Sequence, residues 1–120
     1  MKLIYSIFLI LLPFALSCQS ADCENEPVVF SSYEEAINWI RSARFKVSET
    51  VQTTNSSWIR EASYYSCDGL TGFFIYTTRS SKTYIHATVP AELWKGFVEA
   101  TSHGSFYDRH IKGRFRFDVD

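Results

Sequence analysis

Cysteine and histidine are the side chains of this chain that could attack a carbonyl carbon or bind a metal ion, and it has three of each. A hydrolase would use Cys67 as the nucleophile, His86 or His103 as the base and Asp108 to orient that base. Such a site needs a free thiol beside the base, whereas Cys67 precedes Asp68 and Gly69 in a strong turn signal. The hydrolase is therefore the weaker alternative, and we predict a protein that is not an enzyme, with no catalytic residue.

The histidines also bear on metal binding. His86, His103 and His110 match no spacing typical of a zinc site, and no Cys-x-x-Cys pair accompanies them. Structural or solvent-facing roles fit all three better, so we predict neither a metal nor another cofactor.

The first cysteine, Cys18, follows a stretch that resembles a secretory leader. Lys2 is followed by a nearly continuous apolar run up to Leu16, which is shorter than the roughly 20 residues needed to span a bilayer. Ser17 and Cys18 then complete a run similar to a bacterial lipobox. We predict a signal peptide over residues 1–17, lipidation of Cys18 and a membrane-anchored lipoprotein of the bacterial cell envelope. Cleavage after Ser17 to give a periplasmic or secreted protein is the alternative.

Lipidation of Cys18 leaves Cys23 and Cys67 as the two remaining cysteines. In an oxidising compartment we expect them to form a disulfide, and a free, reactive Cys67 is the alternative. Residues 18–30 are polar and acidic at first and are interpreted as a lipid-anchored tether.

Basic and aromatic residues alternate near the C-terminus. Phe106, Tyr107, Phe115 and Phe117 lie among the basic residues Arg109, His110, Lys112, Arg114 and Arg116. This composition is used for single-stranded nucleic acids, so nucleic-acid or polyanion binding is an alternative function for the segment. The whole chain has a net charge of −1, which gives no basic footprint, and export argues against a nucleic-acid partner. A solvated basic face is the simpler interpretation.

The elements that position these residues begin with a helix over about 32–44, started by serines and glutamates at capping-box spacing. Residues 45–55 then form a strand or an extended connector. Aromatic and β-branched runs predict strands over 58–66, 72–78 and 83–89, joined by short turns. We therefore predict an α+β fold, an antiparallel three-stranded β-meander packed by C-terminal helices, with an N-terminal helix extension.

The centre of the fold is the stretch 82–94, where an alternating run meets Pro90 and a helix. Tyr84, His86 and Thr88 are expected on one face, with Ile85, Ala87 and Val89 on the other. Pro90 suits the first turn of the helix. Gly104 is expected to end that helix in a left-handed conformation, Ser105 to cap a shorter helix, and residues 114–119 to form a final edge strand.

Residues 56–115 resemble the KTSC domain, a module named for the C-terminus of some lysyl-tRNA synthetases. The resemblance is carried by Ser57-Trp58-Ile59, Tyr64, Tyr84, Val89-Pro90, Ala100-Thr101-Ser102, Gly104, Phe106 and the run from Arg109 to Phe115. It implies a domain over residues 56–117, and the predicted helix and connector over 31–55 lie outside it. RNA binding has been suggested for the family, and it implies no catalytic residue.

One departure from the KTSC pattern concerns the central Tyr-x-Tyr, which is Tyr84-Ile85-His86 here. We therefore predict a non-enzymatic binding or interaction module whose ligand is not specified by the sequence. The candidate ligand-binding residues are Tyr84, His86, Arg109, His110, Lys112 and Arg114. The expected partners are the membrane, through the lipid on Cys18, and an envelope protein or polyanion.

Overall fold

The structure is a computed structural model and describes residues 21–27 and 29–119 of the chain. A short 3-10 helix, η1 (Cys23–Asn25), and helix α1 (Tyr33–Ser42) come first. Four strands follow: β1 (Val47–Gln52), β2 (Ile59–Ser66), β3 (Thr71–Thr78) and β4 (Thr83–Pro90). Helices α2 (Ala91–Glu99) and α3 (His103–His110) complete the regular elements, and the α+β class is confirmed. None of the helices in this described part is long and apolar enough to cross a membrane.

The four strands form one antiparallel sheet in the order β1-β2-β3-β4. The prediction of three strands was therefore wrong by one, because the segment left open as a strand or connector pairs with β2 over its whole length. Of the residues of β1, only Val47 and Val51 are partly buried. An edge strand with so few apolar residues has a weak alternation, so its sequence resembles that of a connector.

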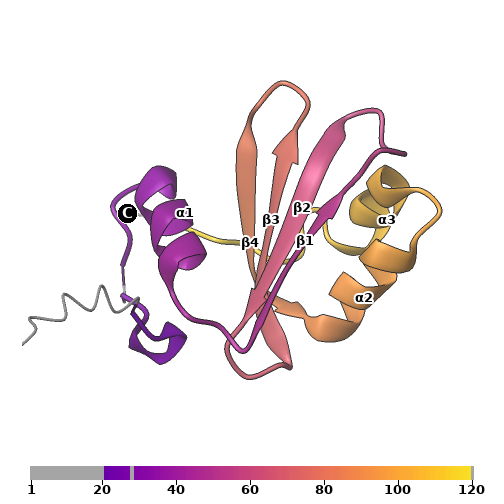
Figure 1. The fold of residues 1–120 in the computed structure, drawn as a ribbon. Helices are drawn as coiled ribbons and strands as arrows, with labels where there is room; N and C mark the ends of the chain where they lie inside the picture. Colours follow the sequence, from indigo (N-terminus) through magenta and orange to yellow (C-terminus); the bar gives the residue numbers. More distant parts are fainter. Residues whose placement is uncertain (1–20, 28, 120) are drawn as a thin grey trace, which may run out of the picture.

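The sheet is covered on both faces, which gives three layers (Figure 1). Helix α1 packs Ala36 and Ile40 against Ile75 and Ile85 on one face. Helices α2 and α3 cover the opposite face, where Phe97 and Ile111 belong to the larger buried cluster. The predicted N-terminal helix is present and covers the face of the sheet opposite to α2 and α3.

The helix ends match the sequence signals only in part. Ser32 caps α1 by accepting a hydrogen bond from the amide of Glu35 at 3.1 Å, as the capping pattern predicted. Pro90 stands immediately before α2 as its N-cap residue, one position earlier than expected.

The expected left-handed cap at Gly104 is wrong. Gly104 belongs to α3, which is capped by Ser102 rather than Ser105 and therefore begins three residues earlier than expected. The glycine is explained by packing, since a Cβ atom there would lie 2.6 Å from Nε1 of Trp58.

Strand β4 carries a bulge that overturns part of the predicted alternation. Gly72 pairs with Val89 and Phe74 pairs with His86, so β4 has one residue more than β3 between these pairs. Thr88 adopts a φ of 59° there. Because of this extra residue, Val89 joins the cluster beneath α2 and α3 rather than the face that carries Ile85.

The C-terminal segment is not the edge strand that its alternation predicted. Residues 114–119 have no strand pairing and run from α3 past the sheet towards α1 (Figure 1). Phe115 packs on the cluster beneath α2 and α3, whereas Phe117 packs on the α1 side. The hydroxyl of Tyr33 donates to the carbonyl oxygen of Phe117 at 3.1 Å. The alternating side chains thus bridge the two faces at the β4 edge, and their backbone does not pair with β4.

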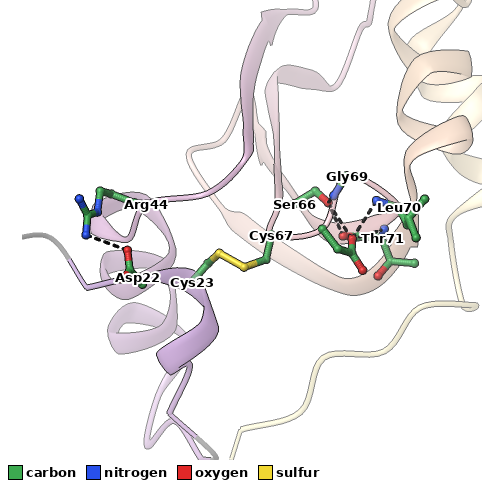
Figure 2. The surroundings of a disulfide bond; sticks show 9 residues. Asp22, Cys23, Arg44, Ser66, Cys67, Gly69, Leu70 and Thr71 are labelled. Carbon is green, nitrogen blue, oxygen red and sulfur yellow. Dashed lines mark hydrogen bonds and ion pairs between the residues drawn. A yellow bond between two sulfur atoms is a disulfide. The ribbon is translucent and has the colours of Figure 1, made fainter.

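A disulfide joins Cys23 of η1 to Cys67 in the turn after β2, with the Cα atoms 5.7 Å apart (Figure 2). The predicted pairing is therefore present. Arg44 forms an ion pair with Asp22 at 2.8 Å beside it. Cys18 and the predicted leader lie outside the described residues.

Candidate functional site

The structure brings three of the predicted ligand-binding residues together. A cleft of about 300 Å³ lies between β4, α3 and the C-terminal segment, and Tyr84, His86 and Arg114 line it. The other predicted residues lie elsewhere: Arg109 and His110 line a shallow hollow beside Phe106, and Lys112 is exposed at the end of α3. The basic-aromatic segment is therefore divided between two surfaces.

The ring of Tyr84 forms the open side of the cleft. It is 41% exposed and stacks on Tyr76, with ring centroids 5.2 Å apart and planes inclined by 24°. Tyr76 is buried and stacks in turn against His86 at 5.9 Å. Cross-strand stacking thus holds one aromatic face rigid and accessible to a ligand.

A chain of hydrogen bonds forms the inner wall. Nδ1 of His86 lies 2.8 Å from the carbonyl oxygen of Phe115, and Nε2 lies 2.9 Å from the hydroxyl of Tyr107. Because a carbonyl oxygen only accepts, Nδ1 carries the proton and the neutral ring accepts from Tyr107 through Nε2. The hydroxyl of Tyr107 in turn accepts from that of Tyr76 at 3.0 Å. Every polar atom of this relay is satisfied.

Burial keeps the relay neutral. Desolvation lowers the pKa of His86, and the hydrogen bond to Phe115 opposes this only in part. Burial is also the main reason that the pKa values of Tyr76 and Tyr107 are raised. The two phenols and the imidazole therefore act as fixed neutral dipoles at neutral pH.

The positive charge of the cleft comes from the C-terminal segment. Arg114 and Arg116 line the cleft, together with one carboxylate, Asp118. The one ion pair recorded for residues 21–27 and 29–119 joins Arg44 to Asp22, so neither cleft arginine forms a salt bridge within that part. Two guanidinium groups beside an exposed aromatic ring can bind an anionic group and a flat ring at the same time.

Sequence reasoning missed several contributors to this cleft. Neither Tyr76 nor Tyr107 was among the candidate residues, and the carbonyl of Phe115 carries no sequence signal. Arg116 was noted in the basic segment but was not among the candidates. Its two-residue spacing from Arg114 could have identified it, because the two side chains share one side of the segment.

The remaining histidines and Cys67 do not form the hydrolase site. Cys67 is bonded to Cys23, so the proposed nucleophile is not a free thiol. His103 is buried and donates through Nδ1 to the carbonyl oxygen of Phe97 at 3.0 Å, which satisfies one of the last carbonyls of α2. In the part of the chain that the structure describes, no three histidine, cysteine or acidic side chains gather as a metal site would require.

Comparisons with known proteins find the KTSC domain in the part of the chain that forms the cleft. The family model of the KTSC domain matches residues 76–115, which include every residue of the relay. A KTSC domain protein from Yersinia pestis, known from its crystal structure, superposes with a TM-score of 0.50 and 28% identity. The superposition covers 58% of this chain and 93% of that one. A search of curated proteins gave no match. The resemblance to the KTSC domain is confirmed.

Proposed function

We propose that this chain is a non-enzymatic binding module of the bacterial cell envelope, and that its cleft binds an acidic glycan. The observation that carries the proposal is the convergence of an exposed aromatic ring, Tyr84, with the two arginines Arg114 and Arg116 in one cleft. An acidic sugar offers a flat apolar face to the ring and a carboxylate or sulfate group to the guanidinium groups.

The hydrogen bonds of His86 and the protonated hydroxyls of Tyr76 and Tyr107 favour binding over catalysis. Both nitrogens of His86 are engaged in hydrogen bonds, so the imidazole has no free site from which to take a substrate proton. The neighbouring hydroxyls of Tyr76 and Tyr107 have raised pKa values and stay protonated. A rigid neutral wall of this kind serves to orient a ligand.

We further propose that Cys18 carries the lipid anchor. Residues 18 to 23 span at most about 18 Å when extended, and the disulfide holds Cys23 to the fold. Cys67 lies in the turn before β3, whereas Tyr84 pairs with Tyr76 near the other end of the strands. An anchored domain would therefore present its cleft away from the bilayer.

Retention on immobilised heparin, an acidic glycan, tests the cleft. We expect binding at low ionic strength, and Arg114→Gln with Arg116→Gln should lower the salt concentration needed for elution. Tyr84→Ala should weaken binding by about 1 kcal/mol or more through the lost stacking. Arg41→Gln with Arg60→Gln removes the same charge elsewhere and is the matched control. Passage of the wild-type protein through the column at low salt would rule the proposal out.

Neutral dextran and single-stranded RNA serve as comparison ligands for heparin. Neutral dextran should not retain the protein, because it lacks the anionic group. Tighter binding of single-stranded RNA than of heparin at equal salt would replace the glycan with a nucleic acid.

Mass analysis of the mature N-terminus tests the anchor, since Cys18→Ser should abolish both the acyl mass and the membrane association.

A further inference from the structure

A second groove lies on the α1 side of the sheet and shares the ring of Phe117 with the glycan cleft. It has a volume of about 470 Å³ and lies where η1 crosses the ends of β2, β3 and β4. Four aromatic side chains, from the sheet, its flanks and the C-terminal segment, line it: Phe45, Tyr65, Phe73 and Phe117. Phe45 contacts Tyr65 and Phe73, with ring centroids 5.6 and 6.2 Å away, so these rings form one continuous surface.

The charged residues that line this groove are all acidic, and a basic side chain, Lys46, lies beside it next to Gly69. Three acidic residues line it, Glu24, Glu26 and Asp68, and no lysine or arginine does. The Asp68 carboxylate already accepts from the amides of Leu70 and Thr71 at 2.8 and 3.0 Å. Glu24 and Glu26 form no side-chain hydrogen bond or ion pair with the residues that the structure describes, and they supply the available negative charge.

The groove also adjoins the outer edge of the sheet. Ala87 and Thr88 of β4 line it at the bulge. β4 is the last strand of the sheet, and within residues 21–27 and 29–119 it pairs with β3 alone. The C-terminal segment crosses its edge at His86, whereas Thr88 beside the groove is exposed. Such an edge can bind an extended peptide through backbone hydrogen bonds, while an adjoining pocket accepts one of its side chains.

We propose that this groove binds a lysine or arginine side chain of an extended segment of a partner protein. The aromatic faces attract the cation through their quadrupoles, and Glu24 and Glu26 neutralise it. The site uses none of the cleft arginines, so it does not depend on the glycan proposal. A module with both sites would join an acidic glycan in the cleft to a basic protein segment in the groove.

The disulfide positions the carboxylates of this site. Glu24 lies within η1 and Glu26 directly after it, and Cys23 fixes η1 to Cys67 beside the groove (Figure 2). Two backbone hydrogen bonds with Arg44 and the exposed Arg44–Asp22 pair are the other recorded restraints on this segment. Exposed ion pairs hold a segment weakly, so loss of the disulfide is expected to release the two glutamates from the groove.

Titration of the isotopically labelled protein with a trilysine peptide blocked at both ends tests the proposal. At low ionic strength we expect amide shift changes centred on Phe45, Tyr65, Phe73 and Thr88. Glu24→Gln with Glu26→Gln should weaken binding about fivefold or more, whereas Glu34→Gln with Glu99→Gln, the matched charge control, should not. A trilysine affinity unchanged by the first pair, or shift changes elsewhere, would overturn the site.

Spermidine tests the use of the β4 edge, and the arginine double variant tests whether the groove and the cleft are independent. Spermidine carries the same charge as the blocked trilysine without a peptide backbone and should bind more weakly; equal affinity would contradict the use of the β4 edge. Arg114→Gln with Arg116→Gln should leave trilysine binding unchanged while it weakens heparin retention, so the two proposals can fail separately. Unfolding curves of each variant show that the fold is retained.

Discussion

The imidazole of His86 is held in the neutral form by its position. It donates to a carbonyl oxygen and accepts from a phenol, and burial lowers its pKa. His103 is also buried, and desolvation lowers its pKa too. In the unfolded chain both rings titrate near the ordinary value of about 6.5. Protons therefore bind preferentially to the unfolded state as the pH falls below that value.

Acid should destabilise the fold through these two histidines. Stability from these histidines is fully present above the unfolded pKa and is lost as the pH falls from about 6.5 through the folded pKa values. In His86→Gln, the free energy of unfolding should fall less steeply between pH 7.5 and 5 than in the wild-type protein. Urea unfolding at each pH measures this. His110→Gln, at an exposed position, serves as the control. An unaltered pH slope in His86→Gln would show that the imidazole is not held neutral.

Thr88 is the β-branched residue with a left-handed backbone in this fold. Its φ of 59° places it in a region that costs an L-residue about 1–2 kcal/mol, and the bulge requires that conformation. Asparagine tolerates it better, so Thr88→Asn should raise the free energy of unfolding by about 1 kcal/mol. Thr83→Asn, in a regular part of the same strand, should lower it. Urea unfolding measures both, and destabilisation by Thr88→Asn would contradict the strain.

At the scale of elements, β3 approaches β2 too closely at Gly72 to accept a side chain. A Cβ atom at this position would lie 2.2 Å from the carbonyl oxygen of Tyr65. Because backbone atoms form the obstacle, Gly72→Ala should cost at least about 3 kcal/mol. Gly113→Ala meets no atom within 4 Å and incurs only the cost of a φ of 76°, about 1 kcal/mol. Thermal unfolding of the two variants should rank them in this order.

Elements with a strong local pattern were predicted well. The strands from 58 to 89 and the first helix have dense apolar patterns and recognisable turns or caps, and the structure places each within a few residues. Local patterns failed where packing decides the outcome. Gly104 has the composition of a helix cap, yet it allows Trp58 to pack against α3. Residues 114–119 alternate like a strand, yet Phe115 and Phe117 are drawn to opposite faces of the sheet.

The same limit applies to the candidate cleft at the scale of the whole molecule. Tyr84 was selected because it matches a family pattern, His86 because it departs from that pattern, and Arg114 because of its charge. Their meeting depends on the C-terminal segment, whose Phe115 carbonyl is 29 positions from His86 in the chain. Contacts at such separations arise from how α3 folds back over the sheet, which residue spacing does not encode. Arg109 and His110 carried the same sequence signal and lie outside the cleft.

The disulfide is the covalent restraint that ties η1 to the sheet, and its loss should affect the whole molecule. Cys23 and Cys67 are 44 positions apart, so on the loop-entropy model the bond constrains the unfolded chain by about 4 kcal/mol. That is a large part of the total stability of a domain of this size, about 5–10 kcal/mol. In a Cys18→Ser background, thiol titration of the denatured protein should find no thiol before reduction and two after it. The same protein should unfold at a much lower urea concentration with reductant, and Cys23→Ser with Cys67→Ser should match the reduced protein without it. Equal unfolding midpoints in the two redox states would mean that η1 contributes nothing to the stability of the fold, and the bond would then serve only to place Glu24 and Glu26.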